Sequence, residues 1–409
     1  MMHRRHLLAC LPIAAALAPR PGMCGPAQGL RAFGALGDGA TDDRAALSRA
    51  LAGGRPLDGG GLTYGISGSL EIGPGFKGIS HCVIRQLQPT SRVRTVVIQG
   101  ASGFHISDVV LLRAGDRDEG AIQRDMQDFA GLWIADCDRF SLERLAVRGG
   151  GVGTGLAINQ CNQFTADDLQ VSEIKYRMRE RPRDDILQGI WLNRSTKFVV
   201  RRPVVSDLGG VDAQGSTHSE TRAIAIGGCS GFSIIDLRVA DCDQGLDVTG
   251  SEGNHDFLIQ GGHASRCVTW GFKFANSASQ GRVENAVAED CGLGGFVVSG
   301  RSEANDPPPQ NILFSNCTAL DCGVAGSPLT TFGFGSTRAK GDPDYPRRIH
   351  FDYCRALDRR NPPAMKWGFI NEIVQAGDEA NTVRGCSVSG AIIAPFRGFG
   401  GIPAAPRHP

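Results

Sequence analysis

Asp247 and Lys273 are the two residues whose types and spacing most readily suggest chemistry. They occupy equivalent places in two successive repeats, Gly245-Leu246-Asp247 and Gly271-Phe272-Lys273. Removing the proton beside a uronate carboxylate requires a general base and a group that neutralises charge, and lysine, arginine, histidine or tyrosine can fill these roles. A carboxylate beside an ammonium favours the charged ammonium, however, so the pair fits a structural ion pair as well. Both roles stay open for these two residues.

Four more side chains capable of acid, base or charge-stabilising chemistry fall at the neighbouring corner of the same repeats, namely Asp241, Asp243, His263 and Arg266. Carboxylates such as Asp241, Asp243 and Asp247 could also act as an acid and base pair, or bind Ca²⁺. The spacing of cysteines and histidines does not predict a zinc site. We therefore expect no cofactor, with Ca²⁺ as the one metal that the carboxylates could hold.

Trp133 and Trp191 are two of the four tryptophans in the chain, and they occur in the related segments GLWIADC and GIWLNRS. If the flanking leucines and isoleucines point inward, strict alternation sends both tryptophans outward, together with Asn159, Asn193, Asp247 and Lys273. An exposed tryptophan face suits the apolar face of a sugar ring. The alternative is that inserted loops cover both tryptophans.

Three long insertions, residues 113–130, 173–188 and 206–221, interrupt the repeats at one corner. Loops inserted at the same corner of successive coils must lie side by side, so they are expected to wall a groove. Tyr176 and Arg177 belong to a basic stretch of the second loop, and His218 lies in the third. Such a wall could hold an anionic polysaccharide, although a solvated charged loop explains the composition equally well.

The repeats themselves predict the element that positions these residues. From Arg222 to Cys322 the chain repeats a unit of about 24 residues four times, and the copies end on Cys242, Cys267, Cys291 and Cys322. Each copy contains short apolar runs with a period of two, which is typical of strands separated by sharp corners. We expect an all-β fold, a single-stranded right-handed parallel β-helix of about ten coils. The period and composition fit leucine-rich repeats or propeller blades poorly.

One aromatic residue recurs in each coil of the predicted solenoid. These residues are Phe104, Phe140, Phe164, Phe198, Phe232 and Phe257. A closed coil has to fill its interior, so we expect the six rings to stack in line inside the tube. The recurring cysteines are expected to form buried ladders of reduced thiols, with disulfides between neighbouring coils as the alternative.

Residues 31–51, RAFGALGDGATDDRAALSRAL, contain Phe33-Gly34-Ala35, Gly37-Asp38-Gly39 and Thr41-Asp42-Asp43 ahead of an amphipathic segment. This pattern resembles the N-terminal signature of the pectate-lyase-like (pectin-lyase-fold) superfamily, shared with phage tail-spike depolymerases. The resemblance implies a strand, a glycine-rich turn and a helix capped by Thr41 or Asp42 that plugs the open end of the solenoid.

The same resemblance implies a polysaccharide substrate. The superfamily includes lyases, hydrolases of the polygalacturonase type, epimerases and tail-spike glycosidases. The segments around Asp247 and Lys273 only loosely echo the polygalacturonase pattern, so a lyase acting on an acidic glycan by β-elimination is favoured. A glycoside hydrolase using an Asp pair and a non-catalytic glycan-binding or envelope protein are the alternatives.

The beginning of the chain predicts export. Arg4 and Arg5 precede an apolar run from Leu7 to Leu17, and Ala16-Leu17-Ala18 fits a cleavage site. The arginine pair resembles a twin-arginine signal, and the run is too short to span a membrane. We expect a periplasmic or secreted protein divided into an export signal and linker (1–27), a cap and first coil (28–80), the β-helix (81–390) and a tail (391–409).

The net charge of +1 implies no bulk attraction to nucleic acid or to an anionic membrane. The expected partner is a polysaccharide or oligosaccharide. Association of the coils into a homo-oligomer such as a trimer is compatible with the pattern.

Overall fold

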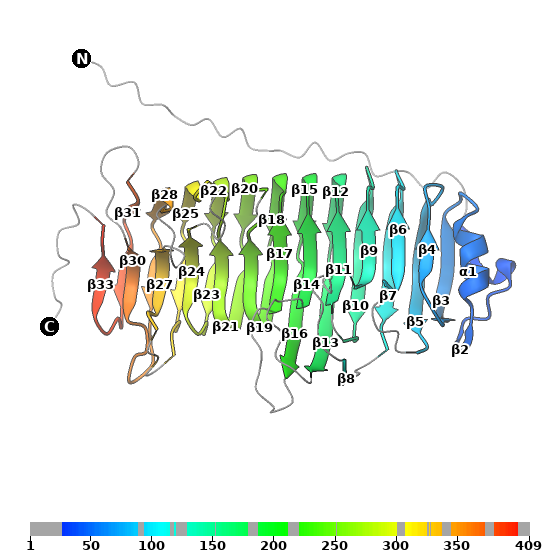
Figure 1. The fold of residues 1–409 in the computed structure, drawn as a ribbon, viewed down its shortest axis with the longest axis horizontal. Helices are drawn as coiled ribbons and strands as arrows, with labels where there is room; N and C mark the ends of the chain where they lie inside the picture. Colours follow the sequence, from blue (N-terminus) through cyan, green and yellow to red (C-terminus); the bar gives the residue numbers. More distant parts are fainter. Residues whose placement is uncertain are drawn as a thin grey trace, which may run out of the picture.

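The protein is a long tube wound from parallel β-strands (Figure 1). The computed structural model describes residues 27–88, 94–114, 118–119, 129–151, 153–178, 187–211, 221–250, 252–300, 307–324, 327, 329–337, 345–372 and 380–399. In this part of the chain, 33 strands form one continuous sheet. This confirms the predicted fold class, a right-handed parallel β-helix.

The sheet winds round the tube as three faces, each a ladder of strands from successive coils. Face 1 carries the predicted site and contains β4 (Leu70–Ile72), β6 (Val96–Gln99), β9 (Ala130–Ala135), β11 (Gly153–Asn159), β14 (Leu187–Asn193), β17 (Thr221–Gly227), β19 (Arg238–Val248), β21 (His263–Phe274), β24 (Gly294–Ser299), β27 (Phe332–Thr337), β30 (Trp367–Asn371) and β33 (Ala394–Arg397). Strand β33 lies beyond the predicted end of the solenoid at residue 390.

Face 2 follows face 1 in each coil. It contains β7 (His105–Leu112), β10 (Ser141–Arg148), β12 (Asn162–Asp167), β15 (Thr196–Arg201), β18 (Ser230–Ile235), β20 (His255–Gln260), β22 (Ser279–Glu284), β25 (Gln310–Ser315), β28 (Arg347–Asp352) and β31 (Thr382–Arg384). The strands β7 and β10 continue round the corner into face 3.

Face 3 completes the coil. It contains β3 (Leu57–Ile66), β5 (Gly78–Gln86), β13 (Gln170–Met178), β16 (Val204–Val211), β23 (Val287–Glu289), β26 (Thr318–Leu320), β29 (Arg355–Leu357) and β32 (Ser387–Ser389). The first residues of β3 and β5 belong to face 2. The first halves of β19 and β21 belong to face 3 and their second halves to face 1, with a register irregularity between Cys242 and Gln244. Three short strands lie beside these: β1 (Gln28–Gly29) and β2 (Asp38–Asp42) pair with β3, and β8 (Asp118–Glu119) pairs with β13.

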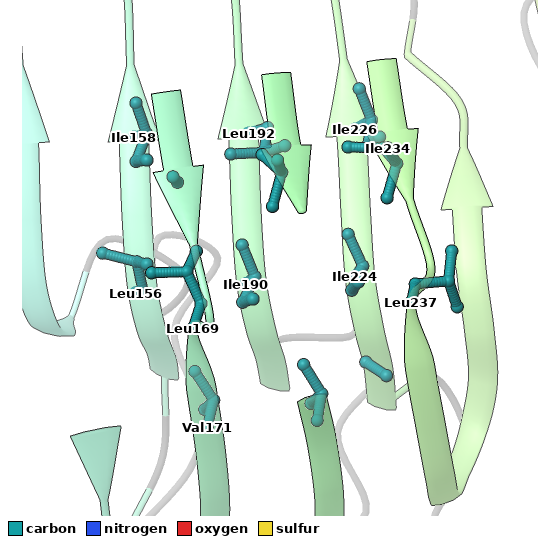
Figure 2. Close-up of a cluster of buried hydrophobic side chains, with 14 of the residues drawn as sticks. Leu156, Ile158, Leu169, Val171, Ile190, Leu192, Ile224, Ile226, Ile234 and Leu237 are labelled. Carbon is teal, nitrogen blue, oxygen red and sulfur yellow. The ribbon is translucent and has the colours of Figure 1, made fainter. Parts of the chain in front are cut away.

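The phenylalanines predicted to stack inside the tube do so. The rings from Phe104 to Phe257 are buried, and the centroids of successive rings lie 4.7 to 5.5 Å apart. This spacing follows from the ladder, because in-register residues of neighbouring strands are about 4.8 Å apart. Between the ring stacks the interior is aliphatic, as Figure 2 shows for Leu156, Ile190 and Ile224 of face 1.

The recurring cysteines are free thiols wherever the structure describes them. Cys242 and Cys267 pair in register at the corner between faces 3 and 1, with their Sγ atoms 3.8 Å apart. Burial raises the pKa of the Cys82 and Cys229 thiols to about 12. The ladder of buried, reduced thiols is therefore the state found.

A short helix, α1 (Arg44–Leu51), sits at the N-terminal end of the tube after a 3₁₀ turn, η1 (Leu30–Phe33) (Figure 1). Its N-cap position is Asp43, one residue after the predicted Asp42, and Oδ1 of Asp42 accepts a hydrogen bond of 3.1 Å from the amide of Arg44, the first residue of the helix. The Asp43 carboxylate instead accepts hydrogen bonds from the amides of Leu36, at 2.7 Å, and Gly37, at 3.1 Å. This carboxylate therefore closes the glycine-rich turn against the helix.

The predicted export signal lies outside the described residues. Among those that are described, no helix is long and apolar enough to cross a membrane.

The phenylalanine stack of face 2 ends at Gly281, which pairs in register with Phe257. A Cβ atom at Gly281 would lie 2.0 Å from Cζ of Phe257. We expect Gly281→Ala to lower the free energy of unfolding by about 1–3 kcal/mol, because the ring must move out of a packed core. Chemical denaturation measures the change. Gly73→Ala is the control, since a Cβ there meets nothing within 4 Å, and equal stability of the two variants would contradict the prediction.

Asp358, at the turn after β29, connects the last coils through hydrogen bonds. Its Oδ2 accepts hydrogen bonds of 2.7 Å from the amides of both Ala364 and Met365, and Arg360 pairs with the same carboxylate at 2.8 Å. Arg360 also donates to the carbonyl oxygens of Cys322 and Gly323 in the preceding coil. Burial by itself would raise the pKa of Asp358, but Arg360 and the two amides outweigh it and lower the pKa to about 2.

A carboxyl whose folded pKa is depressed stabilises the fold above its unfolded pKa, here 3.8, and loses that contribution as the pH falls toward 2. We therefore expect Asp358→Asn to be less stable than the native protein at neutral pH and to lose less stability between pH 4 and 2. Unfolding free energies measured across this range test the prediction. Asp256→Asn removes an exposed carboxylate as a control. If the native protein and both variants lose the same unfolding free energy between pH 4 and 2, the result would count against the role of Asp358.

Candidate functional site

The outer surface of face 1 carries four of the predicted site residues, Trp133, Trp191, Asp247 and Lys273, in one row. Trp133, Ala157, Trp191, Ala225, Asp247 and Lys273 pair in register on six successive strands, and the row continues as Val297, Gly335, Ile370 and Arg397. We call this the central row. The neighbouring residues Leu246, Val248, Phe272 and Phe274 are fully buried in the core, as the predicted alternation requires.

A second row on the same face runs beside the first. It contains Thr154, Gln188, Arg222, Gln244, Trp270, Gly294, Phe332 and Trp367, again in register on successive strands. We call this the flanking row. The two rows together form the surface from which the site is built.

Asp247 lies between two cations at the middle of this surface. Its Oδ2 is 2.9 Å from Nε of Arg222 and 3.6 Å from Nζ of Lys273, which also donates to Oε1 of Gln244 at 3.4 Å. The Asp247 side chain is 0% exposed, whereas those of Arg222 and Lys273 are 22% and 20% exposed. The ion pair predicted as one role of Asp247 and Lys273 is thus present.

The two predicted tryptophans meet over the small side chain of Ala157. Their ring centroids are 5.9 Å apart in an edge-to-face arrangement, and the Arg94 guanidinium lies 3.6 Å from the centroid of Trp133. Trp133 is therefore only 5% exposed, which corrects its expected place on the open surface. Trp191 is half-buried and keeps part of its ring accessible. Trp191 is thus the better platform for a sugar ring.

Asn159 and Asn193 follow the central row two residues further along their strands. Nδ2 of Asn193 donates to Oδ1 of Asn159 at 2.6 Å, and both side chains are half-buried. They lie on the predicted face, and their role in binding stays a prediction.

Three of the predicted catalytic residues lie apart from the central row and have structural partners. Asp241 and Arg266, at the same corner of adjacent coils, form a two-point ion pair with N to O distances of 2.7 Å, and this guanidinium lowers the pKa of Asp241. His263 lies on face 3, where its Nε2 is 3.0 Å from Glu289. The structure therefore does not bring Asp241, His263 and Arg266 together with Asp247 as one reacting group.

Asp243 is buried at the same corner, and its amide donates to Oγ1 of Thr221 at 2.9 Å. In the described part of the chain, no three His, Cys, Asp or Glu side chains gather closely enough to hold a metal ion. Ca²⁺ binding stays a prediction.

The three long insertions all leave from the corner between faces 3 and 1, as predicted, because they join β7 to β9, β13 to β14 and β16 to β17. Tyr176 and Arg177 lie on β13, where they pair with Gly210 and Val211 of β16. Their side chains, and all of His218, are outside what the structure describes. These insertions therefore connect directly to the face that carries Asp247.

Sequence reasoning missed Arg222, Trp270 and Trp367. Arg222 precedes the alternating segment AIAIGG and occupies the position of Gln188 and Gln244 in neighbouring coils. Strict alternation would not have found them. Each lies three residues before a central-row residue of its own strand, and the two residues between, such as Ala223 and Ile224, both face the core. With Trp133 and Trp191, the two new tryptophans place all four tryptophans of the chain on the outer surface of face 1.

No family model matches this sequence, and no curated protein matches it either. Solved structures do match its fold. The A-module of the mannuronan C-5 epimerase AlgE4 from Azotobacter vinelandii has a TM-score of 0.59 at 15% identity, covering 91% of this chain and 100% of that chain. The adhesin PfbA of Streptococcus pneumoniae has a TM-score of 0.59 at 11% identity, with coverage of 91% and 100%.

The catalytic unit of a GH87 alpha-1,3-glucanase from Streptomyces thermodiastaticus has a TM-score of 0.51 at 12% identity, covering 92% of this chain and 71% of that chain. At these identities the likeness shows the fold alone. Like the protein described here, these neighbours are parallel β-helices.

We expect Arg222→Met to lower the free energy of unfolding by about 3 kcal/mol, because it removes a cation from beside a fully buried carboxylate. Arg282→Met is the matched control, since it removes an exposed arginine that pairs with Glu284, and it should cost about 1 kcal/mol or less. Chemical denaturation of both variants at neutral pH gives the comparison. Equal losses would show that the Arg222 and Asp247 pair behaves as an ordinary surface contact.

Proposed function

We propose that the protein is an exported enzyme that cleaves an acidic, uronate-containing polysaccharide by β-elimination on the outer surface of face 1. The observation that carries this proposal is the buried carboxylate of Asp247, held between Arg222 and Lys273 next to the corner that bears the long insertions. Fixed cations in such a place stabilise the negative charge that grows on a uronate when its neighbouring proton leaves. Two partly exposed cations at this place favour an acidic substrate over a neutral one.

Each residue has a separate role in this scheme. Asp247 holds Lys273 and Arg222 in place, and Lys273 is assigned to neutralise the substrate carboxylate. A base takes the proton from the carbon next to that carboxylate, and the electron pair of that bond forms a double bond to the adjacent ring carbon. The bond from the adjacent carbon to the glycosidic oxygen breaks, and the leaving oxygen takes up a proton. Tyr176 of β13 and His218 of the third insertion are our candidates for the base.

Trp191 supplies the apolar contact in the same scheme. Its half-buried ring lies two strands before Asp247 in the central row, about 10 Å away along the tube. A sugar ring stacked there would place its neighbour toward the cations. The names of the fold neighbours, a mannuronan epimerase and an alpha-1,3-glucanase, agree with a polysaccharide substrate.

Binding without cleavage is the second candidate. The observation that favours it is that Asp247 and Lys273 are engaged with each other, and the structures that share this fold include a surface adhesin. Hydrolysis by Asp243 and Asp247 is less favoured, because the Asp247 carboxylate is fully buried between cations and is thus poorly placed to attack or protonate a sugar.

The test is to incubate the purified protein with polygalacturonate, alginate and other uronate polymers and to follow the ultraviolet absorbance of unsaturated chain ends. Lys273→Ala is expected to lower kcat/KM by about 10²-fold, because one charge that stabilises the transition state is lost. Lys197→Ala, which removes an exposed lysine from face 2, should leave activity unchanged.

Other results of this test would assign the protein a different function. New reducing ends without the absorbance would indicate a hydrolase. Binding of a polymer with no product would indicate a binding protein. Equal activity of Lys273→Ala and the native protein would place the site elsewhere.

A further inference from the structure

The outer surface of face 1 carries a second aromatic cluster, on the C-terminal side of Asp247. Val297, Phe332 and Ile370 form its buried floor, and Trp270 and Trp367 pack against this floor while staying half-buried. This cluster lies outside the main core of the tube. We call it the C-terminal platform.

Two glycines shape the platform. Gly294 separates Trp270 from Phe332 in the flanking row, and the two rings lie 5.5 Å apart and nearly parallel across it. Gly335 lies under the Phe332 ring, and a Cβ there would be 2.3 Å from Cε2 of that ring. The small residues let Phe332 lie flat against the sheet, so that it supports the two half-buried tryptophans.

The platform is continuous with the charged centre. Trp270 and Lys273 lie on the same strand, β21, and pair in register with Gln244 and Asp247 of β19. Trp367 lies three strands beyond Lys273 in the ladder, roughly 14 Å along the tube. A chain that leaves Lys273 along the tube axis must therefore cross the platform.

The far end of the platform is cationic. The exposed guanidinium of Arg397, on β33, lies 5.2 Å from the ring centroid of Trp367. At the other end of the surface Arg94 lies over Trp133 in the same way. Paired aromatic and cationic groups suit a ligand whose sugar rings are apolar on one face and carry carboxylates at their edges.

We infer that the C-terminal platform is a second binding site for the same acidic polysaccharide, in which Trp270 and Trp367 stack on sugar rings and Arg397 pairs with a uronate carboxylate. This inference rests on the proposed function. It deepens that function by making the ligand a long chain, since Trp191 and Trp367 are six strands apart in the ladder, roughly 29 Å.

The test compares a long uronate polymer with its trisaccharide, using calorimetry for binding and product formation for turnover. Trp367→Ala and Arg397→Ala are expected to weaken binding of the polymer by about tenfold each and to leave turnover of the trisaccharide at the charged centre unchanged. Lys273→Ala should impair both. Arg397 is exposed, so its variant keeps the test valid if loss of Trp367 disturbs folding.

Tyr353→Ala is the matched control, because Tyr353 is 57% exposed and has Arg384 at 5.8 Å from its ring, but lies at the corner between faces 2 and 3. Native affinity for the polymer in both platform variants, together with impaired Lys273→Ala, would overturn the inference and leave the proposed function standing. Absence of any binding or turnover in the native protein would overturn both.

Discussion

In-register parallel stacking is the constraint on which the rest of this structure depends. Each coil lies about 4.8 Å from the next, so a residue is in contact with the residues that hold the same position in the coils before and after it. Inside the tube the result is columns of like side chains, such as the phenylalanines from Phe104 to Phe257 and the free thiols of Cys242 and Cys267. Like residues stack well there because flat rings and small thiols tolerate that spacing.

On the outer surface of face 1 the same constraint favours unlike neighbours. Here small residues separate some of the bulky rings, whereas Phe332 and Trp367 are direct neighbours in the ladder. Ala157 lies between Trp133 and Trp191, and Gly294 lies between Trp270 and Phe332. The surface has two aromatic regions, with the charged centre around Asp247 between them.

The charged centre also depends on stacking. A fully buried carboxylate is costly unless cations and hydrogen-bond donors surround it. Arg222 and Lys273 supply the cations from the coils on either side of Asp247, while neither Asp247 oxygen accepts a hydrogen bond from the described residues. Burial of the carboxylate thus fixes the positions of two cations that stay partly exposed. The same three side chains therefore contribute to the stability of the fold and to the chemistry proposed for the surface.

The repeats of short alternating runs were enough to predict the parallel β-helix, the inward phenylalanines and the register that aligns Trp191, Asp247 and Lys273, because strand alternation and coil period are local properties of the chain. The sequence alone could not decide what covers each outward residue. Arg94 lies over the ring of Trp133, Glu289 contacts His263 through its side chain, and Arg266 forms an ion pair with Asp241. Each of these contacts joins residues many positions apart in the sequence. Only the stacking of coils, with insertions of unequal length between them, determines such neighbours, which is why Arg222 and the C-terminal platform emerged from the tertiary structure.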